Sequence, residues 1–185
     1  MALAAKDVKP PKADRRKINW SKVRGPKAWI ALIVGTAGGA GLMPKMPGTM
    51  GTLVGVPCAL LTRGWPTESR LLFWAALLAA GTWAARVFDE KMGTSDHQAI
   101  VMDEVVGYGI SAWTVGNGLP AILAAFALFR FFDIVKPWPI RWIDRSSKDW
   151  GNPWAQAFGV MLDDILAAFM ALACLVALQT AGWLS

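Results

Sequence analysis

Long apolar stretches separated by short polar clusters make up the chain after its first 27 residues. The uncharged stretches are residues 28–43, 48–62, 71–85, 105–119, 120–129 and 165–184. A helix that crosses a bilayer needs about 20 apolar residues, and only the last stretch and the region 71–88 approach that length. No segment alternates with a period of two residues. The pattern predicts an all-α protein.

The predicted architecture is a polytopic membrane helix bundle. It has about four spans and one short helix near residues 28–42, which is either re-entrant or interfacial. If the N-terminus is cytoplasmic, only Arg63 and Arg70 fall outside, which agrees with the positive-inside rule. We expect a basic, partly disordered cytoplasmic tail over residues 1–27 and a membrane-embedded domain over residues 28–185.

Composition and charge favour a protein at a boundary between lipid and water. Hydrophobic residues make up 55% of the chain and charged residues 17%, and the mean hydropathy is +0.38. Residues 1–27 carry nine Lys and Arg side chains. This tail either sets the topology or binds anionic lipid headgroups. No basic and aromatic surface continues beyond it, so no nucleic-acid partner is expected.

Two pairs of adjacent carboxylates stand out in this acid-poor chain. They are Asp103-Glu104 and Asp163-Asp164, and an apolar stretch follows the second pair directly. Paired anions repel each other at low dielectric, and a bound cation relieves the repulsion. Oxygen ligands alone suit Mg²⁺. The pairs therefore predict a Mg²⁺ site formed by all four carboxylates, and the alternative is a charged helix end at the lipid interface.

A cluster at residues 130–139 has the residue types that hold a phosphate. Arg130, Asp133 and Lys136 follow at intervals of three, so they share a helix face that ends before Pro137. An Arg fork and a Lys point charge are common phosphate ligands. The alternative is an Arg130–Asp133 ion pair, with Lys136 capping the helix.

A second candidate for anion binding is the segment 45–51. It contains Lys45, followed by Gly48 and Thr49 at the start of an apolar stretch. Backbone N–H groups in such a turn can receive an anion. Alternatively, Thr49 only caps the helix.

Several phosphatase mechanisms are excluded by missing residue types. His97 is the sole histidine, Cys58 lacks an Arg six residues further on, and no Asp-x-Asp or Gly-x-Ser-x-Gly motif occurs. We expect His97 to be a surface residue rather than a catalytic one. We expect residues 144–148 to form a solvated loop. The remaining chemistry is attack by water on a phosphate, assisted by carboxylate-bound Mg²⁺.

Four blocks together resemble the signature blocks of the phosphatidylglycerophosphatase A family. They are MPKMPGTMGTL at 43–53, IVMDEVVG at 100–107, FRFFDIVKPWPI at 129–140 and MLDDILA at 161–167. The resemblance covers roughly residues 28–185 and leaves out the basic tail. It implies an all-helical, Mg²⁺-dependent enzyme of the bacterial inner membrane, with its active site facing the cytoplasm. Its reaction would remove the terminal phosphate of phosphatidylglycerophosphate to give phosphatidylglycerol.

The resemblance also implies functional residues. Its acidic blocks place the catalytic candidates at Asp103, Glu104, Asp133, Asp163 and Asp164. Among the substrate-binding candidates it implies Gly48, Thr49 and Lys136, and the residue types of the two anion-binding clusters add Lys45 and Arg130. A phospholipid substrate and the membrane are the expected partners, and the oligomeric state is left open. Two alternatives remain: a phosphatase for another lipid phosphate, and a non-catalytic ion-conducting or scaffold protein of the membrane.

Overall fold

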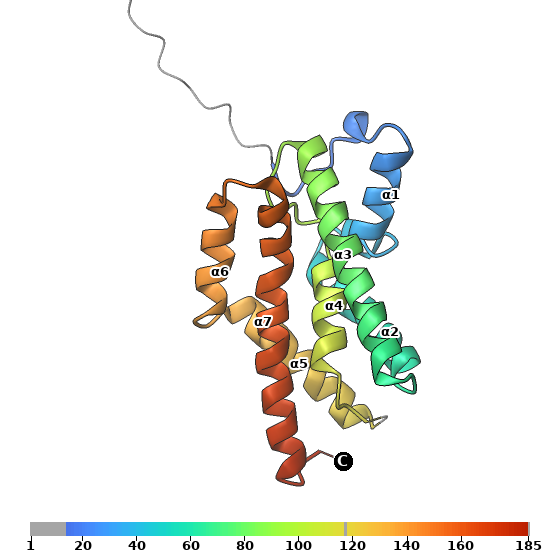
Figure 1. Ribbon diagram of the computed structural model, residues 1–185, viewed down its shortest axis with the longest axis vertical. Coiled ribbons are helices and arrows are strands. Elements are labelled where there is room, and N and C mark those ends of the chain that lie inside the picture. Colours follow the sequence, from blue (N-terminus) through green and yellow to red (C-terminus); the bar gives the residue numbers. More distant parts are fainter. Residues whose placement is uncertain (1–13, 117, 185) are drawn as a thin grey trace, which may run out of the picture.

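The computed structural model describes residues 14–116 and 118–184, and each regular element in these ranges is helical (Figure 1). The α-helices are α1 (Pro26–Gly35), α2 (Pro47–Thr62), α3 (Thr67–Met92), α4 (Met102–Ser111), α5 (Leu119–Val135), α6 (Ile140–Ser146) and α7 (Pro153–Thr180). Short 3₁₀ turns are η1 (Trp20–Lys22), η2 (Ala40–Leu42) and η3 (Ser147–Asp149). The all-α prediction is confirmed.

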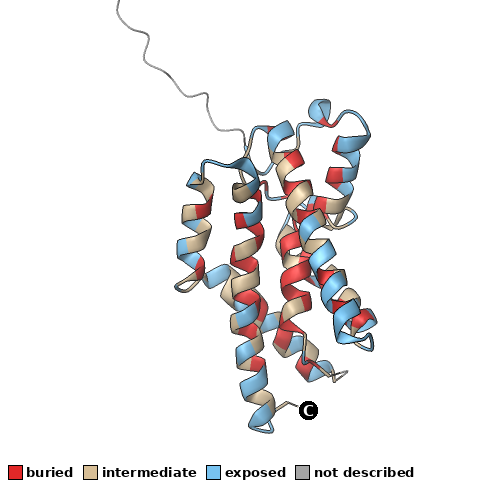
Figure 2. Cartoon of the chain, viewed as in Figure 1, coloured by how far each residue is buried: buried red, intermediate tan, exposed pale blue. Residues whose placement is uncertain are grey.

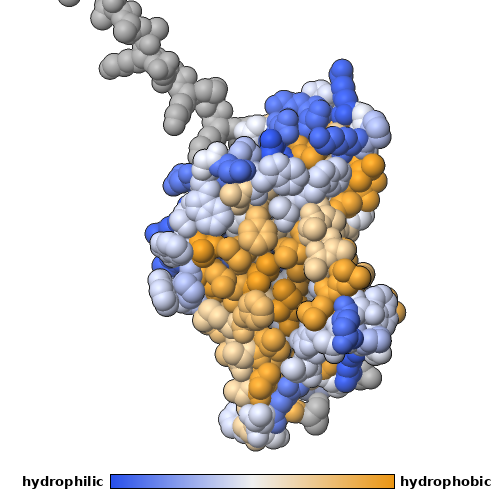
Figure 3. Space-filling view, viewed as in Figure 1, coloured by the Kyte–Doolittle hydropathy of each residue, from blue (hydrophilic) through white to orange (hydrophobic). Residues whose placement is uncertain are grey.

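Two of the described helices, α3 and α7, are long and apolar enough to cross a membrane. They have 26 and 28 residues, or about 39 and 42 Å at 1.5 Å per residue. Large apolar side chains such as Leu61, Leu72 and Ile134 are exposed on the bundle. Figure 3 shows apolar side chains across the middle of one face, with hydrophilic groups above them. An exposed apolar surface of this kind fits contact with lipid.

The central helix α4 is too short to cross a bilayer. Its ten residues extend about 15 Å, half of a hydrocarbon core that is about 30 Å thick. The guanidinium of Arg70 donates to the carbonyls of Trp113 (3.0 Å) and Ala112 (3.4 Å), just beyond the end of α4. The span expected over 105–119 is therefore not a continuous helix, and the prediction of four spans is not confirmed.

Helix α7 begins earlier than its apolar stretch. The side chain of Asn152 accepts hydrogen bonds from the N–H groups of Trp154 and Ala155, so the helix is capped thirteen residues before position 165. Asp163 and Asp164 consequently lie inside the helix, and both are buried. For this pair, the alternative of a charged helix end is wrong.

The short helix expected near 28–42 is divided in two. α1 ends at Gly35, and the chain turns through Gly38 and Gly39, which have φ values of 71° and 106°, into η2. Glycine adopts these left-handed angles at no steric cost. α1 packs along α3, so this segment lies against the bundle.

Close packing of α2 against α4 fixes the start of α4. Gly51 and Gly55 lie one turn apart on α2, and a Cβ atom at Gly51 would approach Val101 Cβ to 2.7 Å. At Gly55 the distance to Tyr108 Cβ would be 3.0 Å. Small residues allow two helix backbones to approach closely. Figure 2 shows buried residues gathered along α4 and the middle of α7, which sets these two helices side by side.

The described part of the basic tail packs on the loop between α3 and α4. We call residues 14–25 the N-terminal arm. The N–H of Gln98 donates to the carbonyl of Arg15 (3.0 Å), and Lys22 Nζ donates to the carbonyl of Met92 (3.2 Å). Val23 is buried. The arm is thus part of the bundle, whereas residues 1–13 of the predicted tail lie outside the described residues.

Candidate functional site

The polar clusters singled out in the sequence surround one cavity of about 330 Å³. The starts of α2 and α4, the end of α5 and the middle of α7 meet around it. Its charged lining consists of Asp96, Asp103, Glu104, Asp133, Asp144, Asp163 and Asp164 together with Arg15, Arg130, Lys136 and Lys148. Acids outnumber bases, so the cavity as a whole favours a cation.

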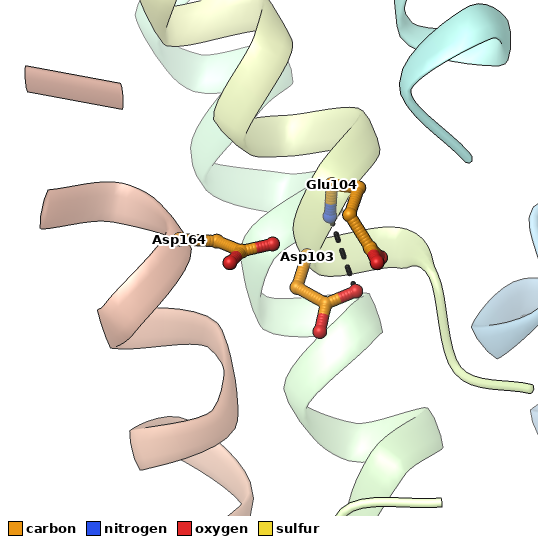
Figure 4. Close-up of side chains that lie close together, drawn as sticks. All are labelled: Asp103, Glu104 and Asp164. Atoms are coloured by element: carbon orange, nitrogen blue, oxygen red, sulfur yellow. Dashed lines mark hydrogen bonds between the residues drawn. The ribbon is translucent and has the colours of Figure 1, made fainter. Parts of the chain in front are cut away.

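Asp103, Glu104 and Asp164 form an acidic triad on two helices. One carboxylate oxygen from each lies within 4.8 Å of the others (Figure 4). The N–H of Glu104 donates to the Asp103 carboxylate at 3.1 Å. Burial and the charge of Glu104 raise the pKa of Asp103 well above its usual range. Burial and the charge of Asp164 raise the pKa of Glu104 to about 8, although the hydrogen bond with Asp103 opposes the shift.

The triad fits a divalent metal ion. All its donors are oxygens, and Glu104 Oε2 is buried with no hydrogen-bond partner among the described residues. A buried carboxylate oxygen without a partner is costly unless a cation or a donor reaches it. A hard cation held between the start of α4 and the middle of α7 would satisfy this oxygen and relieve the repulsion within the triad.

Arg130 lies beside the triad. Its Nη1 is 2.6 Å from Asp133 Oδ2 and 4.0 Å from Glu104 Oε1. The Arg130–Asp133 ion pair, one of the two alternatives left by the sequence, is present. Arg130 also lines the cavity, and its buried Nε makes no hydrogen bond within residues 14–116 and 118–184. Its guanidinium therefore keeps donor capacity next to the acidic triad.

Asp163 takes a different partner from Asp164. Lys136 Nζ pairs with Asp163 Oδ2 and lies 3.3 Å from Asp144 Oδ1. Consecutive residues on a helix point about 100° apart. Asp164 therefore reaches α4 while Asp163 reaches the end of α5. Burial lowers the pKa of Lys136, but the charges of Asp163 and Asp164 outweigh this and raise it above its ordinary value.

Gly48 lies in the first turn of α2, at the wall of the cavity. A Cβ atom there would collide with Glu104 Oε1 and lie 3.1 Å from Arg130 Nη1. The other two residues of this predicted cluster are not part of the lining: Lys45 is exposed and Thr49 is half-buried. Thr49 does not cap α2 either, because Met46 occupies the N-cap without a side-chain hydrogen bond.

Three further charged residues of the lining, Asp96, Asp144 and Lys148, were not expected from the sequence. Lys148 Nζ lies 2.8 Å from Asp144 and 3.3 Å from Asp96, so residues expected in a solvated loop are built into the cavity by α6 and η3. Burial of Asp144 is outweighed by the hydrogen bond from Lys148 and the charge of Lys136, which lower its pKa. The spacing of four residues between Asp144 and Lys148 could have indicated a helical ion pair in this segment.

His97 is fully buried, in contrast to the surface position expected for it. Its Nδ1 accepts from the N–H of Ala99 (3.1 Å), and its ring packs edge-on against Phe88. Burial lowers the pKa of His97, which favours the neutral ring that this acceptor role requires. His97 does not line the cavity and fixes the loop before α4 instead.

Comparison with known proteins identifies relatives over most of the chain. The family model described as phosphatidylglycerophosphatase A matches residues 33–179. A phosphatidylglycerophosphatase A of Haemophilus influenzae is 38% identical over 143 residues, which are 76% of this chain and 83% of the relative. One of Escherichia coli is 34% identical over 148 residues, which are 80% of this chain and 81% of the relative.

A Bacteroides thetaiotaomicron protein with a provisional description as a phosphatidylinositol-3-phosphatase is 34% identical over 148 residues, or 76% of this chain and 87% of its own. No solved structure matches the chain. The range matched by the family model contains all four motifs, and residues of each motif line the cavity. The chain belongs to the phosphatidylglycerophosphatase A family.

Proposed function

We propose that the protein hydrolyses the terminal phosphate of phosphatidylglycerophosphate in a Mg²⁺-dependent reaction, giving phosphatidylglycerol and inorganic phosphate for phospholipid synthesis. The acidic triad in a cavity that also contains Arg130 and Lys136 carries the proposal. Family membership supports a phosphoric monoester hydrolase. The apolar helices α3 and α7 support a lipid as the substrate.

The residues of the cavity have distinct roles in this proposal. Mg²⁺ held by Asp103, Glu104 and Asp164 would neutralise the negative charge that develops on the phosphate oxygens. Arg130, aligned by Asp133, donates to a further phosphate oxygen. Lys136 is protonated and is held by its ion pair with Asp163, so it adds positive charge at the end of α5.

We propose that the cavity lies at headgroup depth and opens to the cytoplasm at the bacterial inner membrane. The N-terminal arm, the C-terminal end of α3 and the start of α7 lie together at one end of the bundle (Figure 1). The N-terminal arm carries five basic side chains, Arg15, Arg16, Lys17, Lys22 and Arg24, and one acidic side chain. Positive charge near a membrane helix favours the cytoplasmic side. The acyl chains of the substrate then stay in the bilayer while its headgroup reaches the triad.

Release of inorganic phosphate by the purified, detergent-solubilised protein tests the proposed function. We expect release from phosphatidylglycerophosphate that EDTA stops and added Mg²⁺ restores. Phosphate release that persists in EDTA would contradict a metal at the triad. Faster release from phosphatidate would favour the second candidate, a phosphatase for another lipid phosphate, which the relative in Bacteroides also suggests. Release from no lipid would favour the non-catalytic alternative.

Substitution of Gly48 tests whether the wall of the cavity fixes the Glu104 carboxylate. We expect Gly48→Ala to reduce kcat/KM about 10- to 100-fold, because the new methyl group displaces a group that must be placed within about 1 Å. The protein should still fold, since the displaced atom ends a flexible side chain. Gly64→Ala is the control, because a Cβ atom at Gly64 would meet nothing within 4 Å. Full activity in Gly48→Ala would show that the carboxylate does not need this position.

A further inference from the structure

Outside the acidic triad, the lining of the cavity carries an alternating row of charges, which we call the basic rim. It consists of Arg15, Asp96, Lys148, Asp144 and Lys136. Arg15 pairs with Asp96, and Lys148 lies between Asp96 (3.3 Å) and Asp144 (2.8 Å). Lys136 follows at 3.3 Å from Asp144. Lys136 also pairs with Asp163, so three cations meet three carboxylates here, and the rim offers cationic donors where the triad has carboxylates alone.

The cations of the rim keep unused hydrogen-bond donors. Arg15 donates from Nε to the carbonyl of Asp96 (2.6 Å) and from Nη2 to its carboxylate. A guanidinium has five N–H donors, and Nη1 donates no hydrogen bond within the described part of the chain. Lys148 Nζ has three donors and two carboxylate neighbours. Both side chains line the cavity, so a further acceptor that enters it can be bound.

Asp96 is held in place by partly buried hydrogen bonds, so the positions of Arg15 and Lys148 do not depend on a loose surface loop. The Asp89 carboxylate accepts from the N–H groups of Asp96 (2.8 Å) and His97 (3.2 Å) and from the Thr94 hydroxyl (2.6 Å). These bonds support the left-handed backbone of Asp96, whose φ is 67°. A non-glycine residue keeps such a conformation only where its surroundings enforce it.

We propose that Arg15 and Lys148 bind a second anionic group of the substrate, the phosphodiester that is not cleaved, while the terminal phosphate lies at the acidic triad. This inference rests on the proposed function, because phosphatidylglycerophosphate carries both a phosphodiester and a phosphomonoester. The diester needs N–H donors other than the groups at the triad, and Arg15 and Lys148 supply them in the same cavity. A volume of about 330 Å³ is within the usual range for a small-molecule site.

The N-terminal arm thereby contributes to the choice of substrate. Arg15 precedes residues 33–179, which match the family model, whereas Lys148 and Asp96 lie inside that range. A lipid with a single phosphomonoester, such as phosphatidate, leaves the pair Arg15 and Lys148 unused. The arm therefore favours a headgroup with two phosphates over a headgroup with one.

The test compares Arg15→Gln and Lys148→Gln with Arg16→Gln. Arg16 is a matched control, since it is the next residue of the arm, is exposed and does not line this cavity. Hydrolysis of phosphatidylglycerophosphate and of phosphatidate is measured in the same mixed micelles with Mg²⁺. We expect KM for phosphatidylglycerophosphate to rise about tenfold in each test variant, the effect of one charged hydrogen bond. Neither kcat on this lipid nor KM for phosphatidate should change, and Arg16→Gln should match the wild type.

The same measurements distinguish a failure of the proposed function from a failure of the second subsite. A wild type that releases no phosphate from phosphatidylglycerophosphate overturns the proposed function. An active wild type whose Arg15→Gln variant loses activity equally on both lipids, or on neither, overturns only the second subsite. Inhibition by inorganic phosphate separates the sources of the anion. Inhibition that weakens in Arg15→Gln while lipid selectivity stays constant would assign the pair to free phosphate and overturn the lipid assignment.

Discussion

Asp164→Asn should reduce phosphate release from phosphatidylglycerophosphate by about 100-fold or more, since even indirect disturbance of a metal site costs 10- to 100-fold. Asp164 is the single member of the triad on α7, and an amide in its place lowers the affinity of the triad for a cation. The thermal stability of the metal-free protein should not fall, because the substitution removes one of three mutually repelling carboxylates. Activity in Mg²⁺ and thermal unfolding in detergent measure the two effects.

Asp149→Asn is the matched control for this substitution. Asp149 lies in η3, is exposed and does not line the cavity, so the same chemical change should leave activity at the wild-type level. Mg²⁺ should raise the unfolding temperature of the wild type and of Asp149→Asn but not of Asp164→Asn. An Asp164→Asn enzyme as active as the wild type would remove this residue from the metal site.

Lys136→Met should lower the free energy of unfolding by about 3 kcal/mol, near the lower end of the range for breaking a buried ion pair. The substitution leaves the Asp163 carboxylate, whose side chain is 6% exposed, without its cation. We use the lower end because the side chain of Lys136 is itself 26% exposed. The loss of Lys136 costs less stability at Asp144, because the Asp144 carboxylate still pairs with Lys148.

The double variant Lys136→Met/Asp163→Asn tests whether the loss comes from the pair. It should regain most of the stability, because neither an unpaired cation nor an unpaired carboxylate is then buried. Unfolding of the two single variants and the double variant in the same detergent gives the coupling energy. Additive losses would show that Lys136 and Asp163 do not stabilise the fold through each other.

The helical class and the residues of the acidic side could be predicted because both are local signals. The apolar stretches show no alternation with a period of two residues, which favours helices over strands. In a chain with few acids, the pairs Asp103-Glu104 and Asp163-Asp164 are conspicuous. Roles within the second pair could not be assigned, because they depend on the rotation of α7 against α4 and α5, which a single sequence does not contain.

Helix ends were less predictable because tertiary contacts set them. The apolar stretch 105–119 looks continuous, yet α4 ends at Ser111, where Arg70 from α3 binds the carbonyls that follow. The charges of Asp163 and Asp164 resemble a helix boundary in the sequence. Lys136 and the start of α4 surround them in the structure, so α7 continues through them.

The basic rim was missed because its partners are remote in the sequence. Arg15 and Asp96 are 81 residues apart, and neither belongs to a recognisable motif. The charge of residues 1–27 suggested a tail acting as a whole, through its total charge. One arginine of that tail instead has a defined neighbour at the cavity.

The packing of the N-terminal arm shows that the start of the folded unit differs from the start of the family-matched segment. Val23 is 5% exposed and belongs to the same hydrophobic cluster as Phe88, Met92 and Ile100. A fragment cut to the family-matched region would expose this cluster to water and take away the carbonyl of Lys17 that faces His97. The cooperative folding unit therefore begins upstream of the segment by which the family is recognised, and shortened forms of the protein for crystallisation or assay need to start before Arg15.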